Sequence, residues 1–137
     1  RILNEKGIKN INVYNSLGRY FYHGILNLCG QHGIGVCVGN SSSGIIEAPA
    51  LRTPTVNIGQ RQLGRVRASS VVDCGETKDE IVAAISRAIS CEFRDEFGVM
   101  NYPFGASGAA QKIKEVLKNV ELDSILKKRF YNIKVAQ

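Results

Sequence analysis

The residues with the clearest chemical potential lie in the stretch GNSSSGIIEAP. A helix that begins at these serines would present unpaired backbone amides and the positive end of its dipole, which together can bind a phosphate. A carboxylate one helical turn further on shares that face. Because it repels phosphate, we expect it to accept hydrogen bonds from ribose hydroxyls. The candidate ligand residues are Ser41, Ser42, Ser43, Gly44 and Glu47.

The same stretch also has a purely structural interpretation. Serine is a common N-cap residue, and Glu47 could simply complement the helix dipole. Neither the G-x-x-x-x-G-K-[ST] phosphate loop nor the G-x-G-x-x-G dinucleotide motif is present. The spacing of these residues alone therefore leaves both interpretations open.

A second glycine-flanked stretch, GQRQLGR, could bring positive charge to a bound phosphate through Arg61 and Arg65. Each of the two stretches directly follows a short apolar segment typical of a buried strand. In a parallel sheet, ligands bind outside the carboxyl ends of the strands. We therefore expect the two loops to lie side by side on one rim of such a sheet.

The elements that must position these loops alternate along the chain. Short β-branched segments predict strands at 11–16, 35–40, 55–59 and 70–75. Apolar residues at helical spacing predict helices at 19–29, 45–52, 77–90 and 108–120, and a last short helix with Ile125, Leu126 and Phe130. Thr77 and Glu80 form a T-x-x-E capping box. The alternation predicts an α/β fold, a Rossmann-like parallel sheet with helices on both faces.

Composition narrows the class of protein. A chain of 137 residues with 44% hydrophobic and 22% charged residues suits one globular domain. The net charge of +6 comes largely from late lysines, interpreted as a solvated helix face, and no nucleic-acid motif appears. No apolar segment is long enough to span a membrane. The four cysteines suggest reduced thiols in a cytoplasmic protein, and no metal-ligand spacing or cofactor motif is present.

The segment GNSSSGIIEAPALRTPTVNIGQRQLGR closely resembles the UDP-N-acetylglucosamine 2-epimerase family, in particular its hydrolysing branch from sialic-acid-type biosynthesis. The resemblance extends back through NVYNSLGRYFYHGILNLC and forward to FGASGAAQKIKEVL. It implies a GT-B fold, in which two Rossmann-like domains hold a UDP-sugar between them. Residues 1–137 would then be part of the C-terminal, UDP-binding domain.

The resemblance also implies roles for individual residues. Ser41 and Ser42 match the loop that binds the diphosphate, and Glu47 matches the carboxylate that holds the ribose. Arg61 matches an arginine that reaches the nucleotide, and the backbone at Leu17 and Gly18 matches the turn beside the uracil. The implied reaction eliminates UDP from UDP-N-acetylglucosamine and adds water, which gives N-acetylmannosamine and UDP.

The catalytic carboxylates of the family lie in an N-terminal domain that has no counterpart in this chain, so we expect the chain alone to be inactive. We also expect its exposed sheet edges and apolar faces to require the missing portion or a second copy, as in a homo-oligomer. Two alternatives stay open: part of a GT-B glycosyltransferase, and a non-catalytic module that binds nucleotide sugars.

Overall fold

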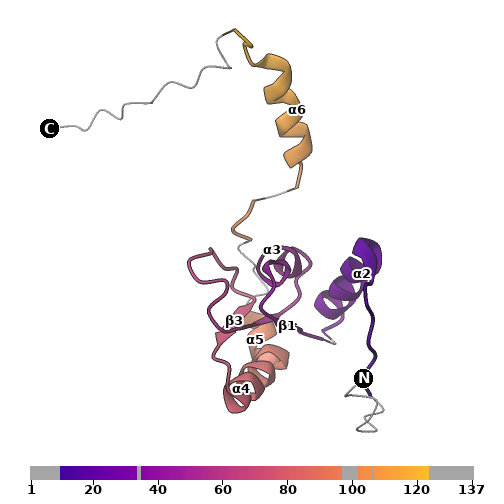
Figure 1. Ribbon diagram of the computed structural model, residues 1–137, viewed down its shortest axis with the longest axis vertical. Coiled ribbons are helices and arrows are strands. Elements are labelled where there is room, and N and C mark those ends of the chain that lie inside the picture. The colour runs from indigo at the N-terminus through magenta and orange to yellow at the C-terminus, as the bar shows by residue number, and fades with distance from the viewer. Residues whose placement is uncertain (1–9, 34, 97–101, 106, 124–137) are drawn as a thin grey trace, which may run out of the picture. The chain divides into compact units, whose positions relative to one another are not determined.

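The computed structural model describes residues 10–33, 35–96, 102–105 and 107–123 (Figure 1). The chain divides into two compact units, Arg1–Phe104 and Gly105–Gln137. Among its described residues, the first unit contains a sheet, four helices and both candidate ligand loops. Within the described residues, no helix is long and apolar enough to cross a membrane.

The sheet of the first unit is parallel and runs in chain order. Its described strands are β1 (Cys37–Gly39), β2 (Thr55–Ile58) and β3 (Val71–Cys74), with β2 in the centre. Val38 is aligned with Val56, and Val56 with Val72. These strands confirm three of the four predicted segments and the predicted Rossmann-like parallel sheet.

The prediction of a strand at 11–16 was wrong. Residues 11–16 adopt no regular structure, and Val13 and Tyr14 are 70% and 66% exposed. Alternating β-branched and aromatic residues favour an extended chain, but a strand also needs a hydrogen-bonded neighbour and a covered face. No described strand pairs with this segment.

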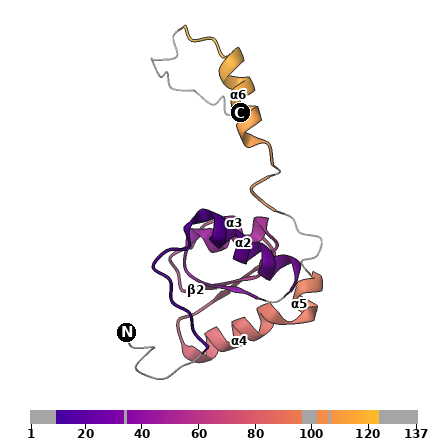
Figure 2. The ribbon, with the colours of Figure 1, turned by 90° about the vertical axis from the view of Figure 1, so that its right-hand side faces the viewer.

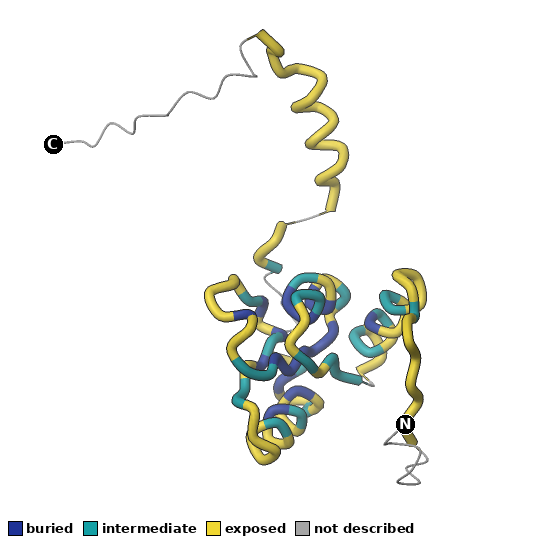
Figure 3. The backbone as a smooth tube through the Cα atoms, in the orientation of Figure 1, coloured by how far each residue is buried: buried dark blue, intermediate teal, exposed yellow. Residues whose placement is uncertain are grey.

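Helices cover the sheet on both sides, as predicted. Helix α3 (Ser42–Ala50) packs on one face and α4 (Lys78–Ile89) on the other, as Figure 2 shows. A short helix that the sequence did not predict, α5 (Cys91–Glu96), follows α4. The buried residues gather around the strands and the inner faces of these helices (Figure 3). The cluster on the α4 side consists of Val56, Val72, Ala84, Ala88 and Phe93.

Helix α3 begins three residues earlier than predicted, at Ser42, and Pro49 lies in its last turn. Its buried face includes Ile45, which is fully buried. Gly44 lies against β2, because a Cβ atom there would be 2.9 Å from the Thr55 methyl group. The small residue therefore lets the start of the helix approach the sheet closely.

Helix α2 (Gly18–Gln31) confirms the helix predicted at 19–29 and packs beside α3. The Thr53 hydroxyl, just after α3, donates a hydrogen bond to the Leu26 carbonyl. Gly30 lies so close to the backbone just after α3 that an added Cβ atom would be 2.0 Å from the Leu51 carbonyl oxygen. These contacts fix α2 beside α3, the helix that begins in the loop at residues 40–44, here called the serine loop.

Helix α4 begins at the predicted capping box. The Glu80 amide donates to the Thr77 hydroxyl, and the Thr77 amide donates to the Glu80 carboxylate. Hydrogen bonds that the Glu80 carboxylate accepts from the Thr77 hydroxyl and, to a lesser extent, from the Thr77 amide hold the pKa of Glu80 below its usual value. In the second unit, α6 (Ala109–Asn119) confirms the helix predicted at 108–120. The predicted last helix lies outside the described residues.

Candidate functional site

The serine loop begins α3 with a local cap. The Ser41 hydroxyl accepts a hydrogen bond from the Ser43 amide, and the Ser41 carbonyl accepts one from the Gly44 amide. Among the described residues, neither the amide nor the hydroxyl of Ser42 has a protein partner. The first turn of α3 therefore combines a structural cap at Ser41 with free donors at Ser42, an arrangement suited to an anion.

Glu47 belongs to a cluster of polar side chains from two helices. The Ser43 hydroxyl donates to Glu47 Oε2 over 2.6 Å, one turn along α3. From α2, the Tyr22 hydroxyl lies 2.6 Å from Ser43 Oγ, and His23 Nε2 lies 3.5 Å from Glu47 Oε2. The sequence analysis assigned no role to His23 or to Tyr22. Their positions on the α2 face toward α3 follow only from how the two helices pack.

The second candidate loop lies beside the first, as predicted. The Asn40 carbonyl, at the end of β1, accepts hydrogen bonds from Arg61 Nη1 at 3.2 Å and from Gln62 Nε2 at 2.8 Å. Gln62 is buried, whereas Arg61 and Arg65 are exposed. Arg61 and Gln62 thus attach their loop (residues 59–65, here called the arginine loop) to Asn40, the residue that precedes the serines.

The side chain of Arg67 acts as a brace for the arginine loop, because it binds both the backbone of the loop and Asp73 of β3. Its guanidinium donates to the carbonyls of Arg65 and Gln62, at 2.6 and 3.1 Å. Its Nε atom forms an ion pair with Asp73 Oδ2 at 2.6 Å, and Asn57 donates to the other carboxylate oxygen. The brace therefore links the loop to β2 and β3. Nothing in the sequence pattern distinguished Arg67 from the other basic residues.

A pocket of about 670 Å³ lies where α2 meets the start of α3. It contains five of the predicted ligand residues: Leu17, Gly18, Ser41, Ser43 and Glu47. The remaining lining residues are Tyr14, Ser16, Arg19, Tyr22 and His23. The other predicted residues, Ser42, Gly44, Arg61 and Arg65, are not part of its lining. Glu47 is the pocket's one carboxylate among these described residues.

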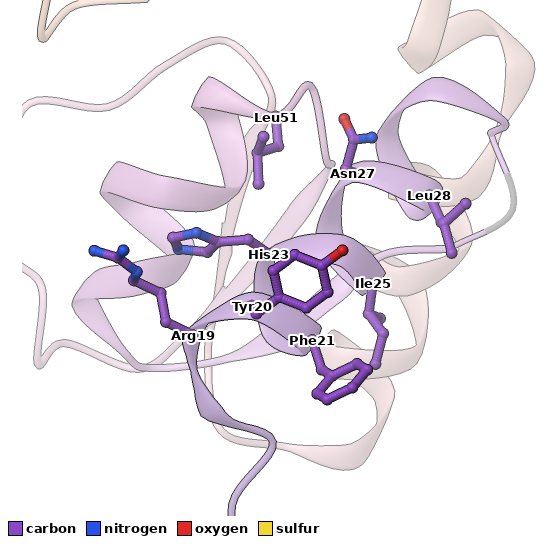
Figure 4. Close-up of a pocket in the computed structure, with 9 residues that line it drawn as sticks. Arg19, Tyr20, Phe21, His23, Ile25, Asn27, Leu28 and Leu51 are labelled. Atoms are coloured by element: carbon purple, nitrogen blue, oxygen red, sulfur yellow. The ribbon is translucent and has the colours of Figure 1, made fainter.

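A second, more apolar pocket of about 750 Å³ surrounds the exposed side of α2. Figure 4 shows Tyr20, Phe21 and Ile25 projecting from the helix there. Arg19 and His23 line both pockets, so the two adjoin. The predicted ligand residues of α3 do not line this second pocket.

The four cysteines are free. Three are partly buried and Cys91 is exposed. Burial raises the pKa of the Cys37 thiol above its usual value, with a smaller effect from nearby Cys29. Cys37 therefore stays protonated at neutral pH and is a packing residue in β1 under the serine loop.

The parallel sheet, with three strands among the described residues, and the rim of adjoining loops define an α/β protein of the Rossmann-like class, in agreement with the GT-B fold that the resemblance implied. Residues 1–118 match the model of the UDP-N-acetylglucosamine 2-epimerase family. The chain therefore belongs to that family.

The chain is similar to three curated relatives, two of which carry names that describe hydrolysing epimerases. It is 34% identical over 130 residues to a GDP/UDP-N,N'-diacetylbacillosamine 2-epimerase (hydrolyzing) of Campylobacter jejuni, covering 94% of this chain and 32% of the relative. It is 38% identical over 100 residues to polysialic acid biosynthesis protein P7 of Escherichia coli, covering 70% and 25%. It is 35% identical over 89 residues to a UDP-N,N'-diacetylbacillosamine 2-epimerase (hydrolyzing) of Legionella pneumophila, covering 65% and 22%. The chain thus spans a third or less of each relative.

Proposed function

We propose that this chain is the UDP-binding part of a hydrolysing UDP-sugar 2-epimerase. The observation that carries the proposal is the pocket that joins the α3 serine loop, Glu47 and the Leu17–Gly18 turn. These segments lie far apart in the sequence, yet they are the ones to which the family resemblance assigns the diphosphate, the ribose and the base. Membership of the family supports the same assignment.

In the proposed complex, the diphosphate binds at the first turn of α3, where the Ser42 amide and hydroxyl are free to donate. Arg61 lies against the Asn40 carbonyl beside this turn and supplies positive charge. The ribose hydroxyls donate to Glu47. The uracil lies near Leu17 and Gly18.

The complete reaction requires groups beyond this chain. Elimination of UDP needs a general acid and a base within hydrogen-bond reach of the sugar. Among the described residues of the pocket, Glu47 is the one carboxylate, and the ribose occupies it in this proposal. We therefore propose that residues 1–137 belong to the C-terminal domain of the enzyme and that the catalytic carboxylates come from another domain.

We propose UDP-N-acetylglucosamine as the substrate, with N-acetylmannosamine and UDP as products. The names of two relatives point instead to UDP-N,N'-diacetylbacillosamine. Both substrates share the UDP portion, which is the portion that this chain would bind. The two substrates are distinguished by incubating each one with the full-length protein and measuring the release of UDP and of the free sugar. Release of UDP only in the presence of an acceptor sugar would indicate a glycosyltransferase.

The binding role is tested at Glu47. Glu47→Gln in the full-length protein replaces a charged acceptor by a neutral one, so we expect UDP affinity to fall about 10- to 150-fold, equivalent to roughly 1.5–3 kcal/mol. Calorimetric titration measures this change. The matched control is Glu92→Gln, an exposed glutamate in the first turn of α5. Equal affinities for the Glu47→Gln variant and the control would show that Glu47 does not hold the nucleotide.

A further inference from the structure

A directed chain of hydrogen bonds leads from α2 to Glu47. A serine hydroxyl carries a single hydrogen, and an ionised carboxylate can only accept. Because Ser43 gives its hydrogen to Glu47 Oε2, the contact between Tyr22 and Ser43 requires Tyr22 to be the donor. The proton donors therefore run in one direction, from Tyr22 to Ser43 to Glu47.

Tyr22 is suited to remain a donor. Partial burial is the largest effect on its hydroxyl, and the nearby Cys37 and Glu47 act in the same direction, so the pKa of Tyr22 lies above its usual value. The hydrogen bond with Ser43 opposes this shift but does not reverse it. At neutral pH the Tyr22 hydroxyl thus keeps the hydrogen that the chain of bonds needs.

The chain of bonds engages only one oxygen of Glu47. Both Ser43 and His23 approach Oε2. Among the described residues, no protein group bonds to Oε1. The Glu47 side chain is 46% exposed and lines the pocket, so Oε1 is available to a ligand there.

We infer that Tyr22 is a positioning residue for nucleotide binding: through Ser43 it holds the Glu47 carboxylate in the orientation that receives the ribose hydroxyls. The inference rests on the proposed function. It also assigns the Ser43 hydroxyl to Glu47 rather than to the phosphate, and leaves Ser42 as the free phosphate donor of the loop. Neither the motif nor the resemblance gave Tyr22 a role.

The test compares two ligands in the full-length protein. Tyr22→Phe removes only the hydroxyl, so we expect UDP to bind about 3- to 10-fold more weakly, as for the loss of one neutral hydrogen bond. The variant should bind 2',3'-dideoxy-UDP, which offers Glu47 no ribose hydroxyl, as well as the unmodified protein does. Ser43→Ala removes the middle link and should give the same pattern. Tyr20→Phe is the matched control, because Tyr20 lies on the same helix and is 84% exposed.

The double variant Tyr22→Phe/Glu47→Gln completes the cycle. We expect it to bind UDP no more weakly than Glu47→Gln alone, because Tyr22 acts only through Glu47. The inference is overturned if Tyr22→Phe weakens the binding of UDP and of 2',3'-dideoxy-UDP equally. It is also overturned if Tyr22→Phe, or Ser43→Ala, leaves UDP affinity unchanged. Either result still leaves Glu47 as the ribose ligand. Unchanged UDP affinity in Glu47→Gln overturns the ribose assignment itself and the inference with it.

Discussion

The brace at Arg67 provides a prediction that joins stability to ligand binding. The Arg67 side chain is 22% exposed, and its guanidinium binds the carbonyls of Arg65 and Gln62 as well as the carboxylate of Asp73. Arg67→Met keeps most of the aliphatic stem and removes all three interactions. The loop would then lose its attachment to β3.

The magnitude follows from these contacts. Hydrogen bonds that involve a charged group contribute about 1.5–3 kcal/mol each, and partial exposure places these two at the lower end. The ion pair adds about 0.5–1 kcal/mol, because Asp73 is 49% exposed and water screens it. Solvation of the released carbonyls offsets part of the loss. We expect Arg67→Met to lower the free energy of unfolding by about 2–4 kcal/mol, and Arg67→Lys by roughly half as much, since a lysine cannot reproduce the fork.

Urea denaturation of the full-length protein measures the stability, and calorimetric titration with UDP measures the effect on the loop. We expect UDP binding to weaken in the same order, with Arg67→Met below Arg67→Lys. Arg52→Met is the control, because Arg52 is an exposed arginine outside the two ligand loops. A stability change in Arg67→Met within about 0.5 kcal/mol of that control would refute the reasoning.

Two further predictions concern α2 and the arginine loop. Gly30→Ala would place a Cβ atom 2.0 Å from the Leu51 carbonyl oxygen and should lower the free energy of unfolding by about 1–3 kcal/mol or more. Gly24→Ala, where an added Cβ atom meets no atom within 4 Å, should raise it by about 1 kcal/mol. Urea midpoints that shift in the same direction for both variants would contradict this pair of predictions. Arg61→Lys in the full-length protein should weaken UDP binding more than Arg65→Lys, because Arg61 already lies beside the serine loop. The opposite order in a calorimetric titration would transfer the ligand role to Arg65.

Local signals predicted the parts of the fold that depend on neighbouring residues. The capping box at Thr77 and Glu80 fixed the start of α4, because both bonds form within one helical turn. The general rule for parallel sheets placed the two ligand loops on one rim, and the shared bonds to Asn40 confirm their contact. The segment at 11–16 had the pattern of a strand, but pairing with a neighbour is not a property of the segment itself.

The features that sequence reasoning missed are contacts between distant residues. Tyr22 and Ser43 are 21 positions apart, and their bond depends on how α2 packs beside α3. The sequence likewise could not separate the three serines, whose hydroxyls differ in their partners: Ser41 caps the helix, Ser43 binds Glu47, and Ser42 is free among the described residues. A propensity scale assigns the same preference to all three.

The strand order has a consequence for the path of folding. Each strand pairs with the next one along the chain, and the Gln62–Asn40 bond that joins the two ligand loops spans only 22 positions. The entropy lost on closing a loop grows with the length of the loop. Parallel strands must be joined by a crossover, and for such a sheet the entropy lost in forming this contact is small. Contacts of short sequence separation form fast. The two candidate loops should therefore come together among the first tertiary contacts of this unit, before any ligand binds.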